Sequence, residues 1–350
     1  MVAKFFKGIG VLVLLALVVM AVSVIRFDKT KEELVPKYAQ APSQFIELAS
    51  GAVAHVRDQG NRQGPVLVLI HGSNASLHTW EPWVADLKDK YRIVTMDMPG
   101  HGLTGRVPGD DYSRAGMVKF THDVLAKLGL SHYAIGGNSM GGGVAAEYAE
   151  DYPGEVTALI LVDASGLPRQ ANPNEKVPLA FRLARMPVIN HIMLYVSPRS
   201  MFAEGVRKVF VDQSKVTDAM IDRYYDLNLY EGNRYATMLR FQLPMDDGKV
   251  AARLGEIKVP TLVLWGEKDG LIPVANAHEF GARIAGAKVA IYPNVGHIPM
   301  EEVADKSATD VDHFLSAAFV TPEAASPAPA TEETSSPAAA GAESPAGNPE

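Results

Sequence analysis

One serine lies in a spacing that suits nucleophilic catalysis. Residues 137–141 read Gly-Asn-Ser-Met-Gly, with Ser139 at the centre, between a short β-rich run and a run of small helix-forming residues. A strand, a sharp turn and a helix in this order lift a serine hydroxyl out of a sheet and place it at a helix N-terminus. The free N–H groups there favour developing negative charge. Ser139 is therefore the predicted nucleophile.

A serine nucleophile needs a base that accepts its proton and an acid that orients the base. His297 lies on a turn, Pro-Asn-Val-Gly-His, after an apolar run that reads as a strand. Asp269 lies in a glycine-flanked loop after another such strand and is the predicted acid. Asp163, which follows the predicted strand at 157–162, is the alternative acid.

Acyl transfer also needs two N–H donors for the oxyanion. Ser73 belongs to the run His-Gly-Ser-Asn at 71–74, directly after the first predicted buried strand, and Met140 follows the nucleophile. The backbone N–H groups of Ser73 and Met140 are the predicted oxyanion hole. His71, Asp97 and His101 are interpreted as structural residues of the neighbouring loops.

The elements that must position these residues alternate between strand and helix, which predicts an α/β fold whose mostly parallel sheet has helices on both faces. The run Pro-Val-Leu-Val-Leu-Ile at 65–70 is continuously apolar, as expected for a strand buried on both faces. The predicted strands are 44–49, 52–57, 65–70, 91–96, 132–136, 157–162, 261–265 and 288–292. The predicted helices are 77–88, 113–128, 140–150, 274–284 and 301–317.

The alternation stops between Leu167 and Ala251, where strand signals are weak and the sequence is helical in character. We therefore expect an α/β core at 44–166 and 252–318, with a helical lid inserted at 167–251. Within the lid, residues 177–211 are rich in Leu, Met, Ile and Phe, with several arginines. This run predicts either an ordinary lid core or an apolar wall that binds an acyl chain.

These segments together resemble the α/β-hydrolase superfamily. The resemblance covers about Phe45–Ala318 and depends on five motifs in the expected order: His71-Gly72, the run Asp-Met-Pro-Gly-His-Gly at 97–102, the elbow at 137–141, Gly-Glu-Lys-Asp at 266–269, and Gly296-His297. It implies an eight-stranded, mostly parallel sheet with a lid after the sixth strand. Within the superfamily the chain looks most like bacterial lid-bearing esterases and lipases, which cleave carboxylic esters without a metal or organic cofactor.

The nearest alternative is the meta-cleavage-product C–C hydrolases, which share the Gly-Asn-Ser-Met-Gly-Gly elbow. They favour a Gly-Pro-rich loop where this chain has His-Gly-Ser-Asn-Ala-Ser, and typically have Trp where this chain has Ile298. Haloalkane dehalogenases and epoxide hydrolases use an aspartate nucleophile, so Ser139 argues against both. A perhydrolase or haloperoxidase activity would use the same triad. A non-catalytic binding protein is disfavoured because all three triad residues are present.

The two ends of the chain differ in composition from its body. Gly8–Ile25 is an uncharged, mostly aliphatic run, so residues 1–25 predict a transmembrane anchor, with a cleaved signal peptide as the alternative. Residues 26–43 read as a polar linker. Residues 319–350 are rich in Ala and Pro and predict a disordered tail. We expect a membrane-anchored protein with an extracytoplasmic, periplasmic body, secreted if the segment is cleaved.

Charge and cysteine content exclude several classes of function. The formal net charge is −7, and five of the acids lie in the tail, so the body is close to neutral and offers no basic face for nucleic acid. The absence of cysteine rules out disulfides and a thiolate nucleophile. The sequence as a whole predicts a cofactor-free serine hydrolase whose substrate is a small-molecule ester with an apolar acyl group.

Overall fold

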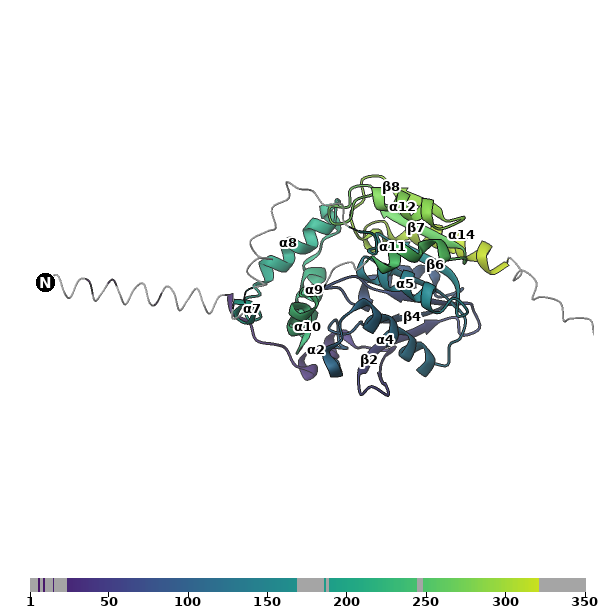
Figure 1. Cartoon of the computed structure of the whole chain (residues 1–350). Helices are drawn as coiled ribbons and strands as arrows, with labels where there is room; N and C mark the ends of the chain where they lie inside the picture. The colour runs from purple at the N-terminus through teal and green to yellow at the C-terminus, as the bar shows by residue number, and fades with distance from the viewer. Residues whose placement is uncertain are drawn as a thin grey trace, which may run out of the picture.

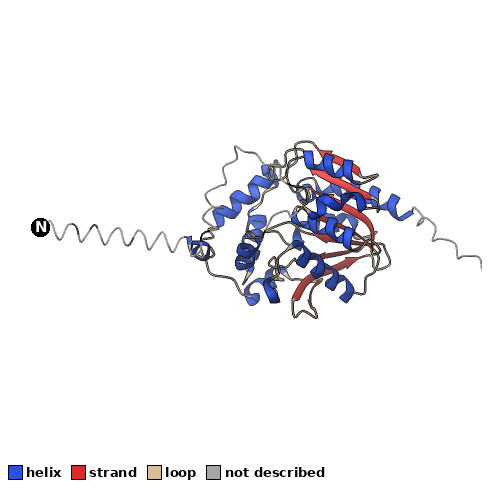
Figure 2. Cartoon of the chain, in the orientation of Figure 1, coloured by secondary structure: helices blue, strands red, loops and turns tan. Residues whose placement is uncertain are grey.

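Eight strands form a single sheet. They are β1 (Ser43–Glu47), β2 (Val53–Gly60), β3 (Val66–Ile70), β4 (Arg92–Met96), β5 (Tyr133–Asn138), β6 (Val156–Val162), β7 (Thr261–Gly266) and β8 (Lys288–Tyr292). Their order is β1-β2-β4-β3-β5-β6-β7-β8, and only the pairs β1–β2 and β2–β4 are antiparallel. The computed structural model describes residues 6, 9, 15, 24–168, 186, 189–243 and 248–320. The predicted eight-stranded, mostly parallel sheet is confirmed. Figure 2 shows its strands in red among the blue helices.

Both faces of the sheet are covered by helices, so the central strands are buried on both sides. One face packs against α4 (Arg114–Lys127), α5 (Met140–Asp151), α11 (Lys249–Arg253) and α12 (Ala275–Arg283) (Figure 1). The other packs against α3 (Glu81–Leu87), α13 (Pro299–Glu302) and α14 (Ala304–Val320). In β3, Val68 and Ile70 join the first core, whereas Leu67 and Leu69 join the second. This alternation explains the continuous apolar run of β3.

Helices fill the interval between β6 and β7, as expected for an inserted lid. They are α7 (Ile189–Met193), α8 (Arg199–Val209), η3 (Gln213–Lys215), α9 (Asp218–Asn228), α10 (Asn233–Arg240) and α11, followed by η4 (Leu254–Glu256). In Figure 1, α8, α9 and α10 form a separate layer beside the sheet. Residues 169–185, 187–188 and 244–247 are outside the described residues, so the predicted apolar wall at 177–211 is described only in part.

The predicted linker at 26–43 is wrong, because much of that segment folds onto the lid. Lys31–Tyr38 forms α2, and Leu34 and Tyr38 are buried against Leu227 and Tyr230 of the lid. Asp226 of α9 accepts hydrogen bonds from Lys29 Nζ at 2.7 Å, Lys37 Nζ at 2.6 Å and the Tyr38 hydroxyl at 2.9 Å. The segment looked like a linker because its charges are matched by a carboxylate far away in the sequence.

The remaining predictions about the two ends are only partly covered by the described residues. In that part of the chain, no helix is long and apolar enough to cross a membrane. The apolar run 8–25 lies almost entirely outside the described residues, as do residues 321–350 of the predicted tail. At the other boundary, α14 continues to Val320, and Phe319 packs against the second core.

Candidate active site

Ser139 lies on a strained turn between β5 and α5. Its backbone has φ 53° and ψ −117°, a conformation that residues other than glycine rarely adopt. The turn is held by hydrogen bonds from Ser139 N to Val162 O at 3.0 Å and from Ser165 N to Ser139 O at 2.9 Å. The surrounding hydrogen bonds therefore hold the serine in this strained conformation, as the predicted elbow requires.

Glycine is required beside this turn because two backbone segments approach very closely. A Cβ at Gly141 would overlap the carbonyl oxygens of Ile70 and His71, and one at Gly137 would overlap the backbone of Gly141. The first turn of α5 is thereby pressed against the end of β3. The loop that follows β3 is thus brought next to Ser139.

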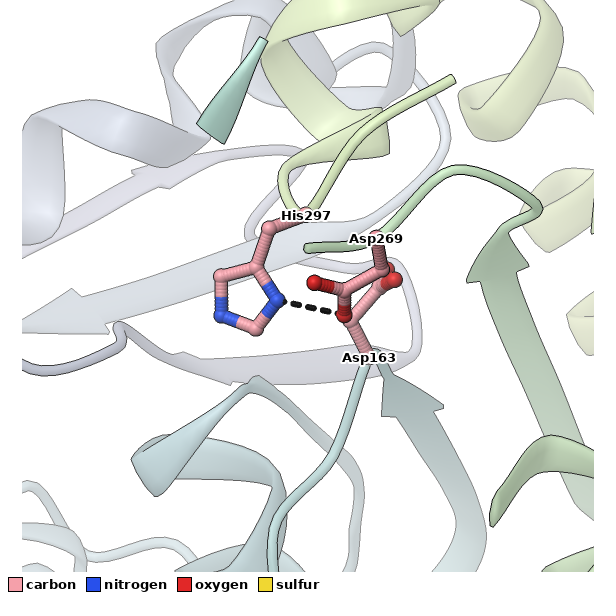
Figure 3. A group of neighbouring side chains, drawn as sticks. All are labelled: Asp163, Asp269 and His297. Atoms are coloured by element: carbon pink, nitrogen blue, oxygen red, sulfur yellow. Dashed lines mark hydrogen bonds and ion pairs between the residues drawn. The ribbon is translucent and has the colours of Figure 1, made fainter. Parts of the chain in front are cut away.

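His297 and Asp269 are hydrogen-bonded to each other in the loops after β8 and β7. The distance from His297 Nδ1 to Asp269 Oδ2 is 2.7 Å (Figure 3). Asp269 Oδ1 accepts from the N–H groups of Leu271 at 2.7 Å and Ile272 at 3.1 Å, which fixes the carboxylate. The backbone of His297 is fixed too, because its carbonyl accepts from Asn138 Nδ2 at 3.0 Å. With Nδ1 directed at the carboxylate, Nε2 is the nitrogen left to exchange a proton.

Asp163, the alternative acid, lies against Asp269 but makes no hydrogen bond to His297 (Figure 3). It is fully buried after β6, with φ 43°, and its Oδ1 accepts from Gly266 N at 3.0 Å. Burial first, and then the neighbouring charge of Asp269, raises the pKa of Asp163 well above its usual range. A protonated Asp163 can donate a hydrogen bond to Asp269, so the two acids have different roles.

The side chains of Asp163, Asp269 and His297 are of types that bind metal ions, and their ligand atoms lie within 4.8 Å of one another. Most of their hydrogen-bonding capacity is already used: Nδ1 of His297 and both oxygens of Asp269 have partners. A cation would also have to displace the proton of Asp163. The donor set therefore fits proton transfer better than metal binding.

Ser73 lies in the loop after β3, and Met140 directly follows Ser139 at the start of α5. Gly72 abuts the elbow, because a Cβ there would lie 2.8 Å from Asn138 Oδ1 and 3.2 Å from Ser139 Cβ. Within the described part of the chain, neither the Ser73 N–H nor the Met140 N–H donates a hydrogen bond to another residue. These two donors are free to bind an oxygen of a ligand.

Sequence reasoning missed one residue here, Arg240 at the end of α10. Its Nη1 donates to Ser73 Oγ at 2.7 Å and lies 3.7 Å from Met140 Sδ. No sequence signal distinguishes Arg240 from the other arginines of the lid, since its partner Ser73 is 167 residues away.

The interpretation of Asp97, His71 and His101 as structural residues agrees with their contacts. Asp97 is fully buried and accepts from His55 Nδ1 at 2.6 Å, Leu77 N at 2.7 Å and Leu103 N at 2.8 Å. Although burial favours the neutral acid, the neighbouring imidazoles hold the pKa of Asp97 well below its usual range. His71 Nε2 accepts from Met98 N at 3.0 Å. This network fixes the loops after β3 and β4.

A cavity of about 530 Å³ connects these groups to the lid. Ser73, Ser139 and His297 line its floor, and mainly apolar side chains from the lid complete it, among them Leu194, Met201, Phe202, Val206, Met238 and Phe241. The volume is in the range of small-molecule sites. Arg234 also lines the cavity, but its guanidinium is paired with Asp28 at 2.6 Å.

We expect Gly141→Ala to destabilise the protein by about 1–3 kcal/mol, because the added methyl group must displace the end of β3. Urea unfolding of the full-length chain measures the change. Gly154→Ala is the matched control, because a Cβ there meets nothing within 4 Å; its effect should stay within about 0.5 kcal/mol. Equal stabilities of the two variants would contradict the close approach of α5 to β3.

Comparison with protein families gives a match over residues 65–191 to the family described as alpha/beta hydrolase fold. Monoacylglycerol lipase ABHD6 of Homo sapiens is 30% identical over 254 residues, covering 72% of this chain and 75% of the relative. Lipase 1 of Psychrobacter immobilis is 28% identical over 303 residues, covering 84% and 88%. The 2-hydroxy-6-oxononadienedioate/2-hydroxy-6-oxononatrienedioate hydrolase of Comamonas testosteroni is 28% identical over 261 residues, covering 72% and 87%.

Solved structures have the same fold. A membrane phospholipase A, described as a bacterial virulence factor, superposes with a TM-score of 0.65 at 23% identity, covering 91% of this chain and 99% of the other. The meta-cleavage product hydrolase of Pseudomonas fluorescens IP01 gives a TM-score of 0.67 at 23% identity, covering 79% and 98%. With the elbow, the sheet order and these relatives taken together, the chain belongs to the α/β-hydrolase family.

Proposed function

We propose that this protein is a serine hydrolase that cleaves carboxylic esters through an acyl-enzyme intermediate. The observation that carries the proposal is the Asp269–His297 pair, whose His297 lines the same cavity as Ser139 on its strained turn. Two relatives of this chain, Lipase 1 and monoacylglycerol lipase, are named as lipases, which cleave esters, and this supports the choice of reaction.

In this mechanism Ser139 Oγ attacks the ester carbonyl while His297 Nε2 accepts the hydroxyl proton. Asp269 holds the imidazole through Nδ1 and stabilises the imidazolium that forms. The N–H groups of Ser73 and Met140 bind the oxyanion of the tetrahedral intermediate. The intermediate collapses to an acyl-enzyme as His297 protonates the leaving alcohol, and water then releases the acid by the same steps.

The cavity favours a substrate with an apolar acyl chain. Its walls are mainly aliphatic and aromatic, and burial of each methylene group of a ligand contributes about 0.8 kcal/mol. The Comamonas relative acts on a dicarboxylate, by its name, and supports C–C hydrolysis as the second candidate. The two cationic side chains that line the cavity do not offer free positive charge to a second carboxylate, because Arg234 is paired with Asp28 and Lys208 with Glu204.

Ester hydrolysis by the full-length protein should depend on Ser139 and should increase from acetyl to medium-length p-nitrophenyl esters. We expect Ser139→Ala to lower kcat by at least about 10³-fold, because no other group can form the acyl-enzyme. A meta-cleavage dienone assayed beside the esters separates the two candidates. Rapid dienone cleavage with weak ester turnover would assign the protein to the C–C hydrolases, and full activity of Ser139→Ala would refute both.

The two neighbouring acids give a matched pair of variants. Asp269→Asn should lower kcat by about 10³–10⁴-fold, because an amide stabilises the wrong tautomer of His297 and cannot balance the imidazolium. Asp163→Asn should have little effect, since its amide can accept from Gly266 N and donate to Asp269 as a protonated acid does. Steady-state kinetics of both variants tests the assignment, and a larger loss in Asp163→Asn would reverse it.

We also propose that residues 8–25 anchor the protein in a membrane, with the body on the extracytoplasmic side. The chain after this apolar run is joined to the lid: Ile25 pairs with Val196, and Arg26 N donates to Tyr195 O at 2.8 Å. Val196 lines the cavity. Ile25, Phe27 and Tyr195 are apolar and exposed, Phe27 to 76%. An anchor at this position would hold the cavity near its lipid-soluble substrates.

Cell fractionation tests the anchor. The full-length chain should stay in the membrane pellet after carbonate washing, and Leu14→Arg/Leu17→Arg should release it, because two charges in an apolar span are costly. The body should be digested when protease is added to intact spheroplasts. A mature protein that begins after residue 23 would identify a cleaved signal peptide instead.

A further inference from the structure

The guanidinium of Arg240 contacts the side chains of both residues whose N–H groups form the proposed oxyanion hole. Nη1 donates to Ser73 Oγ at 2.7 Å and lies 3.7 Å from Met140 Sδ, a distance that suits a hydrogen bond to sulfur. Ser73 follows β3, Met140 begins α5, and Arg240 ends α10 of the lid. One lid side chain thus bridges two segments of the core at the point where negative charge would develop.

Within the part of the chain that the structure describes, Arg240 has no carboxylate partner, whereas the other enclosed arginines do. Its Nε and Nη2 have no exposed surface and no acceptor among the described residues. By contrast, Arg223 is paired with Glu301 at 2.8 Å, Arg234 with Asp28 at 2.6 Å, and Arg57 with Glu81 at 2.7 Å. A buried cation without a counter-charge costs stability. The cost indicates a function for the charge that folding alone does not explain.

The surroundings keep this positive charge unopposed. Burial lowers the pKa of Arg240 to about 10, so the side chain remains protonated at neutral pH. Burial first, and then the charge of Arg240, lowers the pKa of His101 well below its usual range, so His101 is neutral. The carboxylate of Asp97, which is negative, already accepts three hydrogen bonds, from His55, Leu77 and Leu103.

We propose that Arg240 is a positioning residue of the oxyanion hole: it fixes Ser73 and Met140 and places a positive charge behind them that stabilises the oxyanion in the transition state. The inference rests on the proposed ester hydrolysis at Ser139. A fixed charge in a water-poor site acts strongly on charge that develops during reaction, and it needs no reorganisation at that moment. The ground-state ester is neutral and gains much less.

The same contact joins catalysis to the position of the lid. Thr237, Met238 and Phe241 flank Arg240 in sequence and line the cavity, so α10 touches the substrate space and the oxyanion hole together. The oxyanion hole is therefore complete only when α10 is seated against the loop after β3. Substrate that packs against these side chains would favour the catalytic arrangement.

The test compares Arg240→Met, Arg240→Lys and the wild type as full-length proteins on one p-nitrophenyl ester. Arg240→Met should lower kcat and kcat/KM together by about 10- to 100-fold, because the lost interaction belongs to the transition state. KM should change little, and Arg240→Lys should recover part of kcat. Phenylboronic acid, whose adduct with Ser139 is a tetrahedral anion, should bind Arg240→Met more weakly by a similar factor.

Thermal unfolding separates this role from a structural one. Arg240→Met should keep or raise Tm, because it removes an unpaired buried charge. Arg253→Met is the matched control: Arg253 ends α11, is paired with Asp151 and Glu256, and is not among the residues that line the cavity. It should lower Tm and leave kcat unchanged.

Two outcomes would overturn the inference. In the first, Arg240→Met lowers Tm and raises KM with kcat intact, as a purely structural residue would. In the second, Arg240→Met keeps full activity and full affinity for phenylboronic acid while Ser139→Ala is inactive. The second result would contradict the role of Arg240 but remain consistent with ester hydrolysis at Ser139. An active Ser139→Ala variant would contradict the proposed function itself.

Discussion

The close approach of α5 to the end of β3 is the constraint on which the site depends. Only glycine fits at Gly141, where the helix meets the carbonyl oxygens of Ile70 and His71. That contact presses the Ser139 turn against the loop carrying Ser73 and leaves the serine at φ 53°. Because parallel strands end at one edge, the loops after β7 and β8 bring Asp269 and His297 to the same place. Packing and proposed chemistry therefore depend on the same few atoms.

Three buried aspartates near this edge show how local contacts give one residue type different properties. Asp97 keeps its charge because imidazole and N–H groups surround it. Asp163 is enclosed beside another acid, and its pKa rises. Asp269 accepts hydrogen bonds from two backbone N–H groups and is bonded to the imidazole of His297, which fixes its orientation. Burial alone would not distinguish them, since all three are enclosed.

The sequence was sufficient for features that depend on neighbouring residues. The sheet follows from apolar runs bounded by turns, and the elbow from five consecutive residues. His297 and Asp269 were found because each follows a recognisable strand. Contacts between distant segments could not be read in this way: α2 is fixed by Asp226, 188 residues from Tyr38, and Arg240 meets Ser73 across 167 residues. A polar helix and an arginine-containing lid look ordinary until their partners are known.

The lid then has two kinds of attachment, which differ in what they contribute. Ion pairs fix the lid to the N-terminal segment: Asp226 pairs with Lys29 and Lys37, and Arg234 pairs with Asp28. Toward the core, Arg240 reaches Ser73 in the loop after β3, and no carboxylate among the described residues balances its charge. Paired charges can hold a lid at little cost, so holding the lid does not require the unpaired one. An unpaired cation instead suits an active site in which the substrate itself becomes negatively charged. In ester hydrolysis that charge develops only in the transition state, so the cation stabilises the transition state more than the bound ester.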